Sequence, residues 1–196
     1  MEQTIVEIEV FHGTNHTHLT SIKQENFKSS KGTEHEQWLG DGVYFFTKGM
    51  PPNPEETAEN WAIAEAWDNE KRRYSYRKYC VIRALINVDG SKFLDLSDWD
   101  CIETFNYLRN LYIEKLRQER KKLKHGDFKD GHIINKALEN IGLQIDVVRG
   151  NFYFKFRDDR ICNAQFKTPN CTVIAVRNLN CIDIDSIQLH KSNNIK

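Results

Sequence analysis

Two short stretches in which an apolar run meets glycine place the strongest constraint on the fold. Residues 5–11 are apolar at alternate positions, and His12 and Gly13 follow directly. Residues 39–47 read Leu-Gly-Asp-Gly-Val-Tyr-Phe-Phe-Thr, so two glycines precede a second apolar run. Strict alternation and short apolar runs beside glycine are both typical of β-strands. We therefore expect strands over residues 5–11 and 43–46.

Both stretches combine glycine with a side chain that can contact a ligand. Gly13 and Gly42 carry no Cβ, so another molecule can come close to the backbone at these positions. His12 lies at the end of the first expected strand, and Tyr44 lies near the start of the second. The sequence thus predicts that His12 and Tyr44 face one cleft.

Composition narrows the class of protein. The chain has 28 basic and 28 acidic side chains, so its net charge gives no general attraction to nucleic acids or membranes. No stretch approaches the roughly 20 apolar residues of a membrane span, and no signal-peptide pattern is present. Five cysteines without a C-x-x-C pair indicate neither a zinc site nor a disulfide framework. His16 and His18 have the spacing of a metal pair but no third ligand nearby. We expect a cytoplasmic protein without a metal or a membrane partner.

Helical and strand patterns alternate along the chain, which favours an α+β fold. A short helix is expected within residues 15–27. A longer helix is expected from Asn53, as N-cap, and Pro54 to about residue 71. Further strands are expected over residues 80–88, 93–96, 143–148, 152–156, 172–177 and 181–189. Residues 1–190 then form one domain, and residues 191–196 form a frayed tail.

A pair of helices is expected within residues 97–142, beside the sheet. The first begins at a capping box formed by Ser97 and Asp100 and runs to about residue 124. The second runs from about residue 130 to Gly142, which is well placed as a C-terminal cap. We interpret this pair as a helical insertion into the domain.

The two glycine-containing stretches resemble a known family. His-Gly-Thr at 12–14, followed about thirty residues later by Gly-x-Gly-Val-Tyr-Phe at 40–45, is similar to the ADP-ribosyltransferase fold. The similar branch holds the poly(ADP-ribose) polymerases and the diphtheria-toxin-like enzymes, whose motif letters are His, Tyr and Glu. The resemblance covers residues 5–65 well and the remainder loosely. It implies a split β-sheet core around a cleft for NAD, which is the substrate.

The resemblance also implies a role for individual residues. His12 would bond the nicotinamide ribose, the backbone of Gly13 would bond the carboxamide, and Tyr44 would form an aromatic wall. The stretch Ala-Glu-Asn-Trp at 58–61 resembles the segment that supplies a second aromatic wall, although simple core packing also explains Trp61. The NAD-binding residues are then expected to be His12, Gly13, Thr14, Gly42, Tyr44 and Trp61.

The third motif position departs from the family pattern. The family carries Glu at the head of a late strand, whereas the segments at 163–166 and 170–173 contain none. We favour Gln165 as the third catalytic residue, since its amide can hydrogen-bond a ribose hydroxyl. It supplies no negative charge, so polymer extension is not expected. Asp158 or Asp159 could supply the missing carboxylate.

The acceptor of ADP-ribose is the least determined part of the function. Residues 71–79 interleave basic side chains with three tyrosines, and residues 115–124 are strongly basic, which favours RNA slightly over protein. Arg149 and Arg177 are candidates for binding the NAD phosphates. The resemblance implies a mono-ADP-ribosyltransferase of the bacterial toxin or phage-defence type, with an antitoxin or inhibitor as partner. The alternatives are a protein-directed transferase and a module that binds NAD or ADP-ribose without turnover.

Overall fold

The computed structural model describes residues 4–29, 38–50, 52–119 and 130–196, and within them the chain forms an α+β fold around one large sheet. The strands of that sheet are β1 (Ile5–Asn15), β2 (Val43–Thr47), β5 (Lys78–Asp89), β6 (Phe93–Asp95), β7 (Val147–Phe152), β8 (Cys171–Val176) and β9 (Ile182–Asn194). A separate hairpin consists of β3 (Trp67–Asp68) and β4 (Arg73–Tyr74). The α-helices are α1 (Leu19–Glu25), α2 (Pro54–Ala66), α3 (Trp99–Gln118), α4 (Asp130–Ile141) and α5 (Arg157–Ile161).

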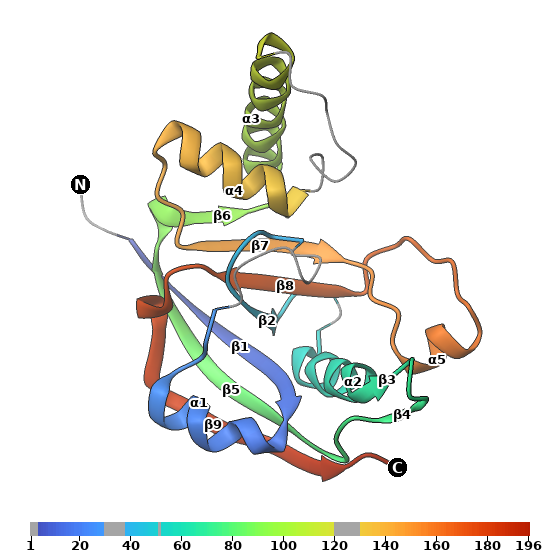
Figure 1. Ribbon diagram of the computed structural model, residues 1–196. Coiled ribbons are helices and arrows are strands. Elements are labelled where there is room, and N and C mark those ends of the chain that lie inside the picture. Colours follow the sequence, from blue (N-terminus) through green and yellow to red (C-terminus); the bar gives the residue numbers. More distant parts are fainter. Residues whose placement is uncertain (1–3, 30–37, 51, 120–129) are drawn as a thin grey trace.

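The large sheet has two parts that meet at a narrow junction. Its strand order is β6-β7-β8-β2-β1-β5-β9, and neighbours run antiparallel except for β6 and β7. Strands β6, β7 and β8 run across the direction of β1, β5 and β9 (Figure 1). The register between β1 and β2 consists of two residue pairs, Val10 with Thr47 and Phe11 with Phe46. The α+β class is therefore as predicted, while the split core that the resemblance implies stays a prediction.

Side chains alternate between two apolar layers, as a pleated sheet requires. One face of the sheet buries residues that include Val10, Phe45, Ile82, Ile174 and, from the α1 segment, Ile22 and Phe27. The other face buries residues that include Phe11, Phe46, Val81, Val173 and, from α2 and α4, Ala58, Ala62, Ile133 and Ile134. We call these the α1 face and the α2 face. Small residues on α2 let its backbone lie close to the strands.

Helix α2 begins as predicted but ends earlier. Pro54 occupies the first turn, and the side chain of Asn53 lies 3.4 Å from the carboxylate of Glu56 rather than capping the backbone. The predicted end near residue 71 is wrong, because Trp67 is already extended and begins the β3–β4 hairpin. Ser75 holds this change of direction, since its backbone N–H and hydroxyl both donate to the carbonyl oxygen of Ala66, at 2.7 and 3.0 Å.

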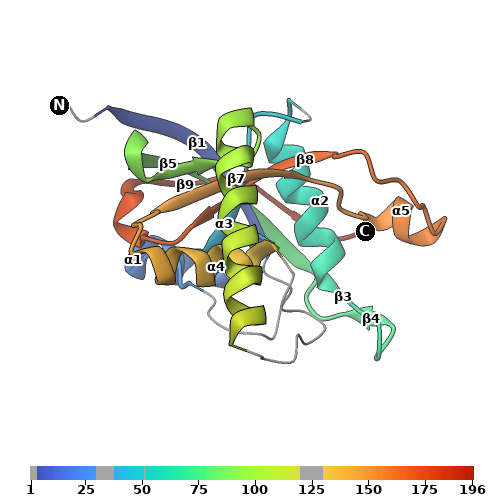
Figure 2. The same ribbon diagram turned by 90° about the horizontal axis from the view of Figure 1, so that it is seen from above.

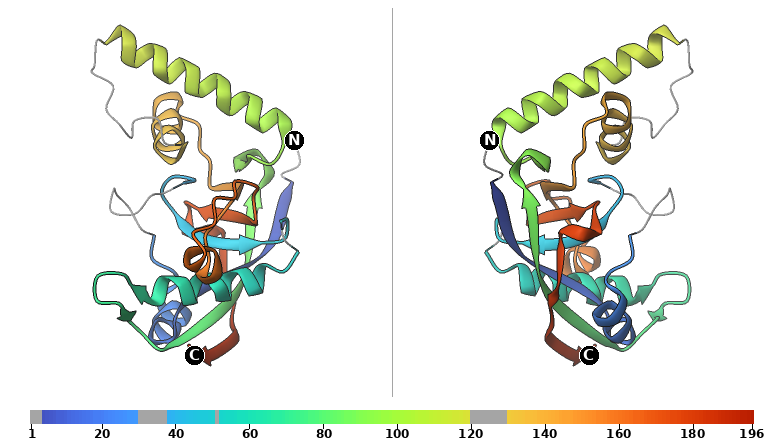
Figure 3. Two further views of the ribbon diagram at one scale, coloured as in Figure 1. Left: turned by 90° about the vertical axis from the view of Figure 1, so that its right-hand side faces the viewer. Right: turned by 90° about the vertical axis from the view of Figure 1, so that its left-hand side faces the viewer.

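Helices α3 and α4 stand together at one end of the molecule, beyond β6 and β7 (Figures 1 and 3). Seen from above, α3 crosses over β7 and α4 (Figure 2). The N-cap of α3 is Asp98, not Ser97, because the Asp98 carboxylate accepts the backbone N–H groups of Asp100 and Cys101 at 3.1 and 3.2 Å. Residues 120–124, where α3 was expected to end, lie outside the described residues. Among the described residues, no helix is long and apolar enough to cross a membrane.

Strand β7 differs from the sequence prediction of two strands around a turn at 149–151. It is one strand that runs through Gly150, whose partner in β8 is Val173. A Cβ at Gly150 would lie 3.1 Å from the side chain of Leu39, so this glycine makes room for packing instead of forming a turn.

The last strand, β9, is longer than expected. Residues 191–194, predicted to be frayed, continue β9 and pair with β5, where Asn194 lies opposite Lys78. Polar side chains do not prevent this, because the pairing uses backbone groups and β9 is an edge strand whose outer side faces solvent.

Candidate active site

His12 is held by the backbone of the second glycine-containing stretch. Its Nδ1 lies 2.8 Å from the carbonyl oxygen of Tyr44, and its ring meets the rings of Phe27 and Phe45 edge to face, with centroids 5.2 and 5.6 Å away. A carbonyl oxygen only accepts, so Nδ1 carries the hydrogen and Nε2 is the acceptor in the neutral ring. Burial lowers the pKa of His12 more than the Tyr44 carbonyl raises it, so the ring is neutral at pH 7. His12 thus presents a hydrogen-bond acceptor on the α1 face.

The Tyr44 side chain points to the α2 face of the sheet. Its hydroxyl accepts the backbone N–H of Leu39 at 2.9 Å and donates to the carbonyl oxygen of Gly40 at 2.7 Å. Burial raises the pKa of Tyr44 to about 12, so the hydroxyl remains protonated at neutral pH. Tyr44 therefore anchors the loop that precedes β2. The structure brings the backbone of Tyr44 to His12, but the two side chains lie on opposite faces of the sheet.

The glycines of both stretches are approached by the protein's own backbone. A Cβ at Gly13 would lie 1.8 Å from the carbonyl oxygen of Ala58, so α2 rests directly on β1 at this point. A Cβ at Gly42 would lie 2.8 Å from the carbonyl oxygen of Val176, and Gly42 has a φ of +155°. Close packing of α2 and β8 therefore requires glycine at both positions, whether or not a ligand also binds there.

Trp61 lies on the same face of the sheet as Tyr44. Its ring centroid is 6.2 Å from that of Phe46 and 5.0 Å from that of Phe154, and the side chain is half-buried. Gly13, Tyr44 and Trp61 thus belong to the α2 face. The aromatic packing of Trp61 is the arrangement that a core role requires, and its half-exposed ring also leaves surface for a ligand.

Thr14 belongs to the α1 face together with His12. Its hydroxyl lies 3.1 Å from Nδ1 of His18, while Nδ1 of His16 lies 3.1 Å from the hydroxyl of Ser192. The two histidines that have metal-pair spacing therefore bind different partners. Within the described ranges, no group of three or more His, Cys, Asp or Glu side chains is arranged to hold a metal ion.

Gln165 lies in the exposed loop between α5 and β8, not at the head of a strand. Its side-chain amide donates to the backbone carbonyl and the side-chain oxygen of Asn163, at 3.3 and 3.2 Å. Strand β8 begins instead at Cys171. Burial raises the pKa of Tyr153, and the negative charge of Asp159 raises it further. The described partners of Gln165 and Asp159 therefore lie within this loop and β7–α5, and His12 is not one of them.

A polar cluster that sequence reasoning missed connects α4 to the Tyr44 loop. The side-chain oxygen of Asn135 accepts the backbone N–H of Asp41 at 3.0 Å and Nη1 of Arg177 at 2.6 Å. The amide nitrogen of Asn135 donates to the Asp41 carboxylate at 3.0 Å. Burial lowers the pKa of Arg177, and the negative charge of Asp41 opposes this. Because Asn135 and Asp41 are 94 positions apart, no local pattern could have revealed the cluster.

Both arginines considered for the NAD phosphates have partners within the protein. Arg177 binds Asn135, as described above. Arg149 binds the Asp95 carboxylate at 3.2 Å and the carbonyl oxygen of Lys48 at 3.0 Å. These contacts hold β7 against β6 and against the end of β2, so Arg149 has a structural role.

Comparisons with known proteins found similarities in sequence and in structure. A search of curated proteins found the uncharacterized protein MJ0359 of Methanocaldococcus jannaschii, which is 28% identical over 154 residues. The match covers 75% of this chain and 65% of that protein, so the chain spans less than two thirds of its relative. A search of solved structures found the M. tuberculosis MbcT–MbcA toxin–antitoxin complex, with a TM-score of 0.39, 10% identity and coverage of 98% of this chain and 86% of that one. No protein-family model matches the chain.

Proposed function

We propose that this chain is an NAD-dependent mono-ADP-ribosyltransferase. The observation that carries the proposal is the placement of its two glycine-containing stretches on neighbouring strands, with Nδ1 of His12 2.8 Å from the carbonyl oxygen of Tyr44. The two stretches that resemble the family motifs therefore meet at one place in the sheet. Neither comparison with known proteins contributes to this proposal.

The reaction breaks the bond between nicotinamide and C1′ of the ribose. Nicotinamide leaves with the bonding electron pair, positive charge develops on the sugar, and a nucleophile of the acceptor attacks C1′ and releases its proton to water. In this proposal the unprotonated Nε2 of His12 accepts a hydrogen bond from a ribose hydroxyl. A neutral ring suits that role, because a protonated His12 would repel the developing cation and could no longer accept.

We place NAD where the β1–β2 pairing ends. The register between these strands stops at Phe11 and Phe46, and His12 and Gly13 follow on β1. Nicotinamide would contact Gly13, Tyr44 and Trp61 on the α2 face, while the ribose would reach His12 and Thr14 on the α1 face. The end of a strand pairing is a location from which a ligand can contact both faces.

The direct test is release of nicotinamide from NAD. His12→Ala should lower the rate by at least about tenfold, because it removes the acceptor that binds the ribose. His190→Ala, at an exposed histidine of β9, is the matched control and should retain the parental rate. Equal rates in the parent and in folded His12→Ala would contradict the assignment.

A second candidate function is binding of NAD or ADP-ribose without turnover. The observation that favours it is the surroundings of His12: its described partners are the carbonyl oxygen of Tyr44 and the rings of Phe27 and Phe45, and these three groups carry no negative charge. Gln165 is exposed and bound to Asn163. Calorimetry with NAD, run beside the release assay, separates the two: a binding module gives heat of binding but no free nicotinamide.

For the acceptor we favour a nucleic acid, most readily RNA, over a protein side chain, and we place the protein among intracellular toxins or phage-defence effectors with an antitoxin or inhibitor as partner. Labelled NAD is incubated with the enzyme and a cell lysate, and portions are digested with ribonuclease, deoxyribonuclease or protease. Loss of label with ribonuclease alone supports RNA. Loss with protease alone would establish the protein-directed alternative. Growth arrest on expression of the parent but not of His12→Ala tests the toxin assignment.

A further inference from the structure

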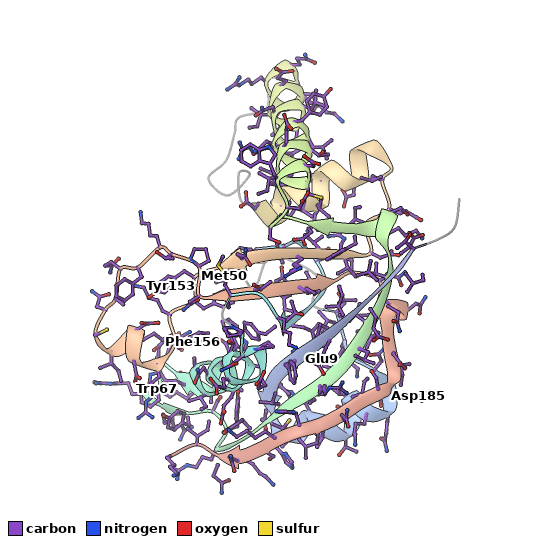
Figure 4. All side chains as sticks on the ribbon, turned by 180° about the vertical axis from the view of Figure 1, so that it is seen from behind. Glu9, Met50, Trp67, Tyr153, Phe156 and Asp185 are labelled. Carbon is purple, nitrogen blue, oxygen red and sulfur yellow. The ribbon has the colours of Figure 1, made fainter. Side chains whose placement is uncertain are left out.

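A groove beside the C-terminal end of α2 is separate from the residues assigned to NAD. It has a volume of about 420 Å³ and lies between the β3–β4 hairpin and α5. Trp67 and Tyr74 line it from the hairpin, and Arg157, Arg160 and Ile161 line it from α5. Figure 4 shows Trp67 at the end of α2, on the side of the molecule that carries α5. The volume is that of a site for a small organic ligand or for one unit of a polymer.

The groove presents a fixed aromatic surface. Trp67 keeps 40% of its surface exposed although it is a large apolar residue. The ring of Tyr74, its partner in the hairpin register, meets it edge to face with centroids 5.2 Å apart. The turn between β3 and β4 is stabilised by the Asp68 carboxylate, which accepts the backbone N–H groups of Glu70 and Lys71 at 3.0 and 2.9 Å. An exposed indole that is held by one neighbouring ring leaves apolar surface on which a flat ring can stack.

The opposite wall supplies positive charge. Nε of Arg160 donates to the carbonyl oxygen of Lys155 at 2.8 Å, and its Nη1 donates to the carbonyl oxygen of Ala64 at 3.2 Å. These bonds fix the guanidinium beside the groove. Arg157 is exposed on the same wall, and among the described residues that line the groove the charged ones are these two arginines. The groove therefore suits an anion that also carries an aromatic ring.

The groove continues into a second hollow, which indicates a polymer rather than a single small molecule. The hollow has a volume of about 590 Å³, shares Trp67 and Arg160 with the groove, and adds Lys155 and Glu65. Arg72 and Arg73 are exposed on the adjoining hairpin. The cationic surface thus extends past the space that one nucleotide fills. Single-stranded nucleic acids bind such surfaces by stacking a base on an aromatic side chain while cations contact the phosphates.

We propose that this groove binds single-stranded nucleic acid, with a base stacked on Trp67 and the adjoining phosphates on Arg157 and Arg160. The inference gives a location to the acceptor of the proposed function, but as a binding claim it does not require ADP-ribosyl transfer. Of the three tyrosines within residues 71–79, two are engaged elsewhere in the protein. Tyr76 donates to the carbonyl oxygen of Ala62 at 2.5 Å, and the buried Tyr79 bonds the Glu59 carboxylate, so Tyr74 is the tyrosine of this segment that lines the groove.

The test measures binding of a fluorescein-labelled twelve-nucleotide RNA of mixed sequence by anisotropy, without NAD, at several salt concentrations. Trp67→Ala should weaken binding about tenfold or more, and Trp67→Phe should recover most of it. Arg157→Glu should weaken binding. It should also lower the slope of the logarithm of the binding constant against the logarithm of salt concentration by about one. The matched controls are Trp99→Ala on α3 and Lys23→Glu on α1, at exposed positions, and both should bind like the parent.

Each other outcome contradicts the proposal. Equal affinity of the parent, Trp67→Ala and Arg157→Glu, all with the parental circular dichroism spectrum, would remove the groove from the binding surface. If free AMP displaced the labelled RNA at the same concentration as unlabelled oligonucleotide does, the groove would be assigned to a mononucleotide. The binding assay does not depend on nicotinamide release. RNA binding without nicotinamide release would overturn the transferase assignment and leave the groove assigned to RNA. Nicotinamide release without RNA binding would overturn the groove assignment and leave the transferase.

Discussion

Nδ1 of His12 lies 2.8 Å from the carbonyl oxygen of Tyr44, while the Tyr44 ring points to the face of the sheet opposite the His12 ring. The contact has two consequences. It fixes the tautomer of a buried neutral imidazole, and it joins β1 to β2 just past the last residue pair of their register. The stability of this junction and the state of the candidate active site therefore depend on the same hydrogen bond.

The first prediction concerns pH. Because the pKa of His12 is lowered from its usual 6.5 by burial, the unfolded chain binds more protons than the folded one between the lowered value and 6.5. The contribution of His12 to stability is therefore complete above pH 6.5 and is lost as pH falls through the folded pKa. Urea denaturation from pH 7.5 to 5 should show this decline. In His12→Gln, the free energy of unfolding should fall less steeply with decreasing pH. An unchanged dependence on pH would show that other groups cause the decline.

A second prediction concerns the Tyr44 hydroxyl. Tyr44→Phe removes the acceptor of the Leu39 N–H and the donor to the Gly40 carbonyl, so it should lower the free energy of unfolding by about 1–3 kcal/mol. Tyr107→Phe, at an exposed tyrosine of α3, should leave it unchanged. Chemical denaturation measures both variants. If Tyr44→Phe is as stable as the parent, the loop is not held by this hydroxyl.

Gly13 gives the third prediction. The Cβ of Gly13→Ala would lie 1.8 Å from the carbonyl oxygen of Ala58, which is backbone and cannot rotate away. Helix α2 must then move, and we expect a loss of stability of more than about 3 kcal/mol. In Gly90→Ala, the nearest atom is 3.4 Å away and the effect should be small. Thermal melting of the two variants gives the comparison, and similar melting temperatures would argue against direct packing of α2 on β1.

The fourth prediction tests the polar cluster. Asn135→Ala removes the acceptor of the Asp41 N–H and the partner of the half-buried Arg177, so it should cost about 2 kcal/mol and speed amide exchange at Asp41. Lys136→Ala, next to it in α4, breaks an exposed ion pair with Glu139 but keeps both hydrogen bonds between Asn135 and Asp41, so it should leave Asp41 protected. Hydrogen exchange followed by mass spectrometry covers the loop. Unchanged exchange in Asn135→Ala would mean that α4 does not hold it.

Periodicity in the sequence predicted the strands that form the core. Alternating apolar residues located β1 and β5, and an apolar run beside glycine located β2, because each strand is buried on one or both faces. The end of α2 could not be predicted in this way. Residues 66–71 contain neither proline nor glycine, and the helix stops because Ser75 bonds back to the carbonyl oxygen of Ala66.

The candidate site shows a second limit of the sequence. Motif spacing placed His12 and Tyr44 in one region, but their faces depend on the register. Phe11 pairs with Phe46, and the next side chain along β1, that of His12, meets the ring of Phe45 and not that of Tyr44. A change of register by one residue would exchange the faces of a whole strand, and nothing in either segment alone specifies it. The contact of Asn135 with Arg177 is also invisible locally, since 42 positions separate them.

The pairing of β5 with β1 on one side and β9 on the other has a consequence for the order of folding. The bond from the Leu85 N–H to the Ser186 hydroxyl joins residues 101 positions apart, and the register of β1 with β5 joins Ile5 to Asp89. During synthesis, β5 is left with an unpaired edge until residues 182–194 have emerged from the ribosome. Such long-range pairing slows folding and prolongs exposure of strand edges. We therefore expect slow refolding, with aggregation that increases with protein concentration.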